Sequence, residues 1–322
     1  MRFVSLAIGS FGVRRLIPYV LLTISAICWA GNLTVGRYVY PDVMPATLSF
    51  WRWFIASVIL AVIFLPAVRQ QWQVVVTHWK YLFLLALSGV LMFHLLVYWS
   101  LRMTTTLNAA LIISLAPVII VVLSRWILRT SITLKQTLGV AVSLVGACVV
   151  IVRGDLSVLR SVALNSGDLL MLVALPNWAL YSVLLKRKPP KLDPRAMLVA
   201  TLFIGLVMTI PFTLWEINNT QAIRWSISTA AGIAYLGVFA GALAYICWNR
   251  GVGEVGANRA GLFLHLIPLF AALFAVMFLG ERIQGYHLVG AALIVFGICL
   301  TNVESGLGKR GVTTAVTRAT HR

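Results

Sequence analysis

Apolar runs of about 20 residues recur along the whole chain, each bounded by charged residues or by proline and glycine. A helix of that length crosses the ~30 Å hydrocarbon core of a bilayer. None of the runs alternates between apolar and polar residues, as a membrane-spanning strand would. We therefore predict an all-α integral membrane protein with ten transmembrane helices. The predicted spans are residues 16–36, 46–66, 79–101, 106–128, 134–152, 167–187, 195–215, 227–249, 258–279 and 285–303.

The fourth and fifth of these spans resemble the ninth and tenth. Residues 109–148 align without a gap to residues 260–299, at an offset of 151 positions. Apolar helices share Leu and Ala by chance, so the informative matches are proline, glycine, cysteine and tryptophan. They are Pro117 with Pro268, Gly139 with Gly290, Gly146 with Gly297 and Cys148 with Cys299, and, at an offset of 149, Trp29 with Trp178 and Trp99 with Trp248. The chain therefore carries an internal duplication.

The duplicated unit contains five spans, and this number fixes the orientation of the second copy. An odd number of crossings leaves the chain on the opposite side, so the second copy enters the membrane inverted. We predict two inverted five-helix repeats, related by a pseudo-two-fold axis in the membrane plane. The predicted segments are a cytoplasmic N-terminal segment at 1–15, repeats at 16–152 and 167–303, an extracytoplasmic linker at 153–166 and a disordered cytoplasmic tail at 304–322.

Composition agrees with a membrane protein, because 61% of the residues are hydrophobic and only 11% are charged. The net charge of +18 would suit nucleic-acid binding, but most Lys and Arg residues fall in segments that a cytoplasmic N-terminus places inside the cell. This distribution follows the positive-inside rule and puts both termini in the cytoplasm. We therefore expect the lipid bilayer, and no nucleic acid, as the partner of the basic charge. The four cysteines lie within predicted spans without metal-ligand spacing, so no metal, disulfide or cofactor is expected.

Several motifs together resemble the EamA-type branch of the drug/metabolite transporter superfamily. The first is the run N-A-A-L-I-I-S-L-A-P at 108–117, whose repeat mate ends in Pro268. The others are Phe278-Leu279-Gly280-Glu281-Arg282, which resembles the "LGE" motif of the family, and Arg52 in the second span. The first repeat departs from the pattern, because it has Leu128-Arg129-Thr130-Ser131 where the second has Leu279-Gly280-Glu281-Arg282. The resemblance, which extends to bacterial aromatic amino acid exporters, implies a ten-helix transporter in the bacterial inner membrane.

Polar and aromatic side chains recur at same-face spacing in four of the spans. Inverted-repeat transporters bind their substrates near the midplane between the repeats, and polar groups at lipid depth face inward. The four spans are repeat mates in pairs, so we expect these side chains to converge on one central cavity. The candidates for this cavity are Trp29, Asn32, His94, Tyr98, Trp99, Trp178, Tyr181, Tyr245, Trp248 and Asn249, with His265 and its repeat mate Ser114.

Some of these residues have a plainer interpretation. Tryptophans near helix ends commonly form an interfacial belt, which is an open alternative for Trp99 and Trp248. His265 can simply bond a neighbouring helix, and Ser114 can be ordinary packing. A belt is the favoured interpretation for Trp51, Trp53, Trp72, Trp79, Trp126, Trp215 and Trp225, and a structural role is favoured for Arg52. Pro117, Pro268 and Pro176 are hinge or gating candidates, with a static kink as the alternative for the first two.

The sequence offers no constellation for catalysis, so we do not expect an enzyme. No Asp or Glu lies at mid-membrane depth in the predicted spans, and His94 and His265 are the only evident groups for proton coupling. Facilitated passage is equally compatible. The favoured function is a secondary transporter that exports small metabolites by alternating access, and we expect it to be a monomer. Amino acids, including aromatic ones, are the substrates suggested by the resemblance and by the attraction of aromatic faces for ammonium groups. The alternatives are a flippase for a lipid-linked carrier and an exporter of cationic drugs.

Overall fold

The computed structural model describes residues 2–220, 223–279 and 282–302, and all regular structure within these residues is helical. Eight helices in this part of the chain are long and apolar enough to cross a membrane. Two further apolar helices, Leu16–Asn32 and Gly285–Thr301, are shorter. The all-helical membrane architecture is therefore confirmed, with eight helices of spanning length where ten were predicted. Glu281 of the "LGE" motif and the predicted tail at 304–322 lie outside the described residues.

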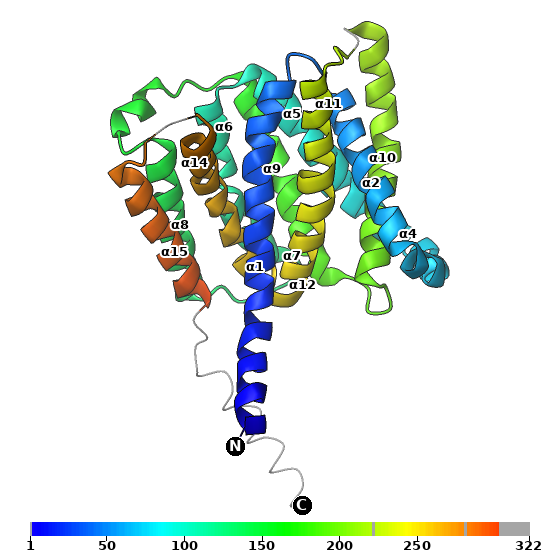
Figure 1. Cartoon of the computed structure of the whole chain (residues 1–322), viewed down its shortest axis with the longest axis horizontal. Helices are drawn as coiled ribbons and strands as arrows, with labels where there is room; N and C mark the ends of the chain where they lie inside the picture. Colours follow the sequence, from blue (N-terminus) through cyan, green and yellow to red (C-terminus); the bar gives the residue numbers. More distant parts are fainter. Residues whose placement is uncertain (1, 221–222, 280–281, 303–322) are drawn as a thin grey trace, which may run out of the picture.

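The helices form one bundle, in which α1 runs the full height and extends beyond the others at one end (Figure 1). The elements before the linker are α1 (Arg2–Val39), α2 (Pro45–Gln70), α3 (Trp72–Thr77), α4 (Trp79–Leu85), η1 (Ala86–Met92), α5 (Phe93–Met103), α6 (Thr106–Ile113), α7 (Ala116–Ile127) and α8 (Leu134–Ile151). The linker itself contains a short 3-10 helix, η2 (Leu156–Ser161). The elements after it are α9 (Ser166–Leu184), η3 (Leu185–Arg187), α10 (Pro194–Asn219), α11 (Ile227–Tyr235), η4 (Leu236–Leu243), α12 (Ala244–Val255), α13 (Ala257–Gly261), η5 (Leu262–His265), α14 (Leu266–Leu279) and α15 (Gly285–Asn302).

The helix contacts occur in matched sets across the two repeats. α8 packs on α15, which is its repeat mate, and α2 packs on its mate α10; these pairs form opposite edges of the bundle (Figure 1). Between them, α1 packs on α12 and α14, while its mate α9 packs on α5 and α7, the corresponding elements of the first repeat. Each of these contacts made by one repeat thus has a counterpart made by the other.

The contact between α8 and α15, here called the seam, is built from the four glycines that the repeats share. A Cβ added at Gly139 would lie 2.6 Å from the carbonyl oxygen of Gly297, and one at Gly146 would lie 2.8 Å from that of Gly290. Because Gly139 and Gly290 are mates, as are Gly146 and Gly297, these two contacts are equivalent to each other. Such reciprocity is the property of a two-fold interface. The order of the contacts also shows that α8 and α15 run antiparallel.

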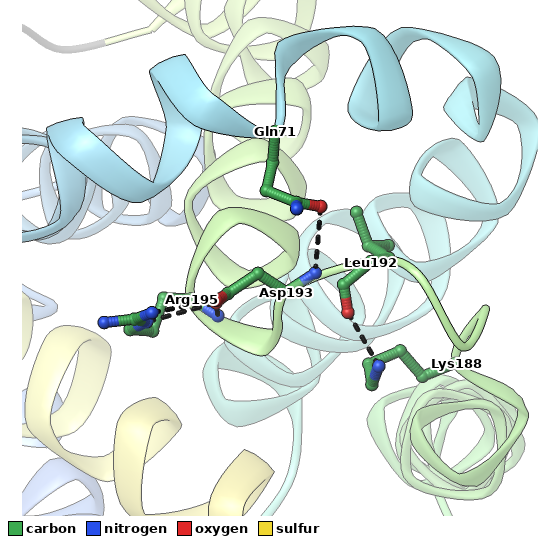
Figure 2. Close-up of polar contacts among 5 residues, drawn as sticks. All are labelled: Gln71, Lys188, Leu192, Asp193 and Arg195. Carbon is green, nitrogen blue, oxygen red and sulfur yellow. Dashed lines mark hydrogen bonds and ion pairs between the residues drawn. The ribbon is translucent and has the colours of Figure 1, made fainter.

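The α2–α10 pair is held at both ends by side chains that satisfy helix N-termini. The carboxylate of Glu216, near the end of α10, accepts hydrogen bonds from the backbone N–H groups of Ala46 and Thr47, both at 2.9 Å. At the opposite end the side-chain oxygen of Gln71 accepts from the backbone N–H of Asp193, at 3.3 Å (Figure 2). Asp193 is the N-cap of α10. Free N–H groups at helix starts need such partners, particularly where lipid excludes water.

Helix interruptions occur at equivalent places in the two repeats. The π-helical segments η1 and η4 interrupt the third span of each repeat. In the fourth span of the first repeat, α6 ends at Ile113 and α7 begins at Ala116, one residue before Pro117. In the second repeat, η5 ends at His265, three residues before Pro268. Proline lacks an N–H and disfavours a helical conformation in the preceding residue, which accounts for a break at this point.

Candidate functional site

Aromatic rings from both repeats meet at the centre of the bundle. Trp29 of α1 lies 5.1 Å from Trp178 of α9 and 5.3 Å from Trp248 of α12, measured between ring centroids. Trp178 and Trp248 are themselves 5.4 Å apart, and Tyr245 lies 5.9 Å from Trp178. All four side chains are buried. The repeat mates Trp29 and Trp178 therefore contact each other directly.

The π-helical segments supply backbone acceptors to this cluster. The indole N–H of Trp29 donates to the carbonyl oxygen of Ala240 in η4, at 3.2 Å. The hydroxyl of Tyr245 donates to the carbonyl oxygen of Gly89 in η1, at 2.7 Å. A π turn locally shifts the backbone hydrogen-bond register, and such turns are frequent at functional sites. Each π-helical segment here fixes the orientation of one aromatic ring.

Two adjoining cavities lie beside the rings. The smaller, here called the chamber, has a volume of about 60 Å³ and is lined by Trp29, Asn32, Phe93, His94 and Trp178, among others. The larger, here called the vestibule, has a volume of about 680 Å³. Its lining includes Tyr38, Ser114, Arg153, Pro268 and Tyr286. The cavities share Ile113, Leu264 and Ile267 as lining residues, so the vestibule is adjacent to the chamber.

Most of the predicted site residues lie at or next to the chamber. Asn32, His94, Trp29 and Trp178 line it directly. The His94 ring is buried, and the backbone carbonyl groups of Gly89 and Val90 in η1 lie close to it. Tyr98, Tyr181, Tyr245, Trp248 and Asn249 form the layer behind these residues through ring contacts and the 2.7 Å hydrogen bond from the Tyr181 hydroxyl to Asn249.

Trp99 and Trp53 both lie elsewhere than predicted. Trp99, a candidate for the central cavity, lies outside it, whereas Trp53, expected at the membrane interface, lies at the centre. Trp99 lies outside the central cluster, where its ring packs on Phe212 at 6.3 Å and its indole N–H approaches Glu216 at 3.4 Å. It follows Tyr98 directly, so the helix turns it onto another face. Trp53, expected in a belt, is fully buried, and its ring lies 4.9 Å from that of His94. The belt interpretation of Trp53 is therefore wrong.

His265 contacts its own repeat mate. Nε2 of His265 lies 2.9 Å from the carbonyl oxygen of Ser114, and Nδ1 lies 2.8 Å from the hydroxyl of Ser143 on α8. His265 is fully buried and lines neither cavity, whereas Ser114 lines the vestibule. The imidazole therefore joins the two interrupted helices to the seam.

The three predicted hinge prolines have different surroundings. Pro117 and Pro268 follow the helix interruptions, and Pro268 also lines the vestibule. Pro176 lies inside the continuous helix α9 and is exposed. The geometry needed for a hinge is present at the first two prolines only.

Sequence reasoning missed several residues that shape the site. Phe93 lines the chamber, and its ring lies 5.0 Å from that of Trp178. The carbonyl groups of Gly89 and Ala240 hold Tyr245 and Trp29, but no side chain marks a π-helical acceptor. Arg52 could have been found, because an arginine inside an apolar span is a functional-site signal by default. Its fully buried guanidinium donates to Asn32, Tyr98 and the Ala240 carbonyl.

Comparison with known proteins identifies the class of this bundle. The model of the EamA-like transporter family matches the chain twice, over residues 16–152 and 165–303. The uncharacterized transporter YyaM of Bacillus subtilis is 28% identical over 290 residues, which cover 89% of this chain and 93% of that protein. An uncharacterized transporter of Archaeoglobus fulgidus is 26% identical over 288 residues, covering 89% of this chain and 97% of that protein.

A solved crystal structure shares the fold. It superposes with a TM-score of 0.69 at 17% sequence identity, covering 89% of this chain and 96% of the other. At that identity the likeness concerns the fold alone. The family match extends over both repeats, and the two similar proteins from Bacillus subtilis and Archaeoglobus fulgidus are named as transporters. The chain belongs to the EamA-like transporter family.

Proposed function

We propose that this protein is a secondary transporter that exports small metabolites by alternating access, with amino acids, including aromatic ones, as its substrates. The observation that carries the proposal is the meeting of repeat mates beside the chamber. Trp29 contacts Trp178, and Ser114 contacts His265. A cavity on the axis between two inverted five-helix repeats is where rocking of one repeat against the other alternates access.

The two cavities support a conformation that is open at one end. The chamber is too small for an amino acid, since about 60 Å³ holds only a few water molecules. The vestibule is larger and adjoins it at the end of the bundle that carries Tyr38, Arg153 and Tyr286. With both termini in the cytoplasm of a bacterial cell, this end faces outward. We propose that the chamber widens as the repeats rock and that substrate passes through it.

Aromatic amino acids fit the lining chemically. Tryptophan and phenylalanine rings stack on apolar rings, and ring faces attract ammonium groups. Asn32 and His94 add polar side chains at the same place. A flippase would need Arg52 on a wall that opens to lipid, but this side chain is fully buried. A cationic drug would meet the positive charge of Arg52 close to the chamber, which favours the amino-acid proposal over the drug exporter.

The test is counterflow of labelled amino acids in liposomes that contain the purified chain, with and without a pH gradient. We expect saturable flux of phenylalanine and tryptophan. Trp178→Ala should lower this flux roughly tenfold, because the substrate loses a ring contact. Trp126→Ala is the matched control, since Trp126 is 74% exposed at the end of α7.

Three outcomes of the counterflow experiment decide whether the proposed function stands. Flux lost only in Trp178→Ala supports an amino-acid carrier that uses the chamber. Equal flux in both variants refutes the chamber as the path, and no flux above protein-free liposomes refutes the substrate class. A rate that follows the pH gradient indicates proton coupling, whereas an unchanged rate indicates facilitated passage.

A further inference from the structure

Arg52 is a buried cation whose hydrogen-bonding capacity is only partly used. Its Nη1 donates to the hydroxyl of Tyr98 at 2.8 Å and to the side-chain oxygen of Asn32 at 3.3 Å, and its Nη2 donates to the carbonyl oxygen of Ala240 at 2.9 Å. A guanidinium carries five N–H donors. Its Nε is buried and has no partner among the described residues. The side chain itself is fully buried, with its guanidinium 4.7 Å from the ring centre of Trp53.

No carboxylate balances this charge in the part of the chain that the structure describes. The ion pairs formed by Arg195 with Asp193 and by Arg250 with Glu254 lie at exposed positions and do not include Arg52. A lone buried charge costs several kcal/mol, and buried charges in proteins are normally paired. Every acceptor of Arg52 is neutral.

The buried carboxylates of the protein are used differently. Asp168 accepts hydrogen bonds from Asn108 and from the backbone N–H of Asn165 at the start of α9. Glu216 accepts from backbone N–H groups at the start of α2. Both carboxylates therefore serve helix N-termini, and neither forms an ion pair with Arg52 among the described contacts. Among the fully buried charged side chains, Arg52 is the one left without a charged or helix-end partner in the described residues.

Asn32 links Arg52 to the chamber. The side-chain oxygen of Asn32 accepts from Arg52 and also from the hydroxyl of Tyr98 at 3.2 Å, and Asn32 is a lining residue of the chamber. Its amide oxygen thus occupies the position where two donors converge. A ligand oxygen in the chamber reaches both donors once the Asn32 side chain rotates away. A carboxylate is the group that such donors favour, because charge-assisted hydrogen bonds to arginine are about twice as strong as neutral ones.

We propose that Arg52 is the anion-binding group of the transport site, and that a carboxylate of the substrate replaces the amide oxygen of Asn32 against Arg52 and Tyr98. This inference rests on the proposed function and adds to it the group of the protein that binds the substrate carboxylate. The bound carboxylate supplies the negative charge that the protein lacks, and the rings of Trp29 and Trp178 contact the remainder of the substrate. The neutral occupant, Asn32, holds the site in the absence of substrate.

The test measures binding of two ligands that differ only in charge, 3-phenylpropionate and 3-phenylpropionamide, by calorimetry on the purified full-length chain in detergent. We expect the acid to bind roughly 10- to 100-fold more tightly than the amide, the ratio for hydrogen bonds to a charged group. Arg52→Gln should remove this preference. Arg52→Lys keeps the charge without the forked geometry and should retain part of it.

Asn32→Asp is the decisive variant, because it places a carboxylate of the protein itself against Arg52. We expect it to lose the preference for the acid and to unfold at a temperature no lower than the wild type. Arg102→Gln is the matched control, since Arg102 is an exposed arginine at the end of α5 and its loss changes the net charge equally. This control should keep the full acid preference.

The amide binding as tightly as the acid overturns the proposal, and so does an acid preference that survives in folded Asn32→Asp. Failure of the wild-type chain to bind the acid at millimolar concentration overturns it as well. These outcomes are distinct from failure of the proposed function. Amino-acid flux with no preference for acid over amide leaves the transporter standing without the Arg52 site, whereas acid binding without amino-acid flux leaves the site standing and removes amino acids as substrates.

Discussion

The seam and the chamber both lie where the two repeats meet, yet they are built from opposite kinds of residue. At the seam, glycines let the backbones of α8 and α15 approach closely, with no room for a single added Cβ at Gly146. At the chamber, the same relation between the repeats brings together tryptophan, phenylalanine, histidine and asparagine side chains. Small residues allow close packing of membrane helices, whereas large ones leave spaces whose shape depends on side-chain rotation.

On the proposed alternating-access mechanism, this difference predicts separate mechanical roles for the two regions. Close backbone contact leaves the seam without alternative packings, so it suits a fixed pivot. The chamber has side chains that can rotate, adjoining π-helical segments and interrupted helices, which suit the moving part. The pivot and the moving part are thus adjacent, and three substitutions test whether they are separable.

The largest effect is expected where the seam is disturbed. Gly146→Ala places a Cβ 2.8 Å from the carbonyl oxygen of Gly290 and 2.9 Å from the backbone nitrogen of Ile294. The helices must separate, at a cost of roughly 1–3 kcal/mol in the free energy of unfolding. Thermal unfolding in detergent measures this loss of stability. Gly253→Ala is the control, because nothing lies within 4 Å of the added Cβ, and a helical alanine should stabilise by about 0.5–1 kcal/mol.

A similar stability for Gly146→Ala and Gly253→Ala would contradict the fixed seam. A Gly146→Ala protein that is destabilised and yet transports normally would separate packing at the seam from the rocking motion.

An intermediate effect is expected at His265, which links the seam to the interrupted helices. His265→Leu leaves the Ser143 hydroxyl and the Ser114 carbonyl without this partner, which should lower the free energy of unfolding by about 1–2 kcal/mol. A double-mutant cycle with Ser143→Ala should give a coupling of about 0.5–1.5 kcal/mol, as measured for hydrogen bonds between membrane helices. Strict additivity of the two substitutions would show that the imidazole does not hold α8.

The smallest effect is expected away from both regions, at the N-cap of α10. Hydrogen bonds from Arg195 lower the pKa of the Asp193 carboxyl. Asp193→Ala should cost about 1 kcal/mol at neutral pH through loss of the cap. Because the folded pKa is lowered, the charged part of this contribution is present above the unfolded pKa of about 3.9 and is lost as pH falls through the folded value.

Unfolding of the wild type and Asp193→Ala at pH 7 and pH 3 measures this dependence. The difference between the two proteins should shrink at the lower pH, and transport should be unaffected at pH 7. A loss of flux in Asp193→Ala comparable with that in Trp178→Ala would contradict the assignment of function to the chamber.

The sequence predicts the repeat and the broad position of the site because both depend on residue type at fixed spacing. Gly139, Gly146 and their mates are recognisable because only glycine permits the close approach that the structure shows. Trp29 and Trp178 are recognisable because a duplicated tryptophan deep in an apolar helix is rare. The family match over both repeats confirms the transporter class that these patterns indicated.

The positions of Trp53 and Trp99 and the backbone acceptors of the site depend on helix rotation and backbone geometry. Neither can be read from the sequence of a single helix. Trp53 and Trp99 both lie near predicted helix ends, yet one faces His94 and the other faces Phe212. Spacing along one helix gives the relative directions of its side chains but not which neighbour each direction meets. The π-helical acceptors at Gly89 and Ala240 are set by tertiary packing and carry no side-chain signal.

The contact of His265 with Ser114 has a consequence for how such a chain can evolve. In a pair of identical five-helix subunits, every substitution would appear on both sides of the axis at once. A histidine at this position would then appear at both places, so that two imidazoles would lie where the structure has one imidazole and one small serine side chain. Joining the two units in one chain frees each side of the axis to vary alone. The residue pair at 114 and 265 is a place where that freedom has been used.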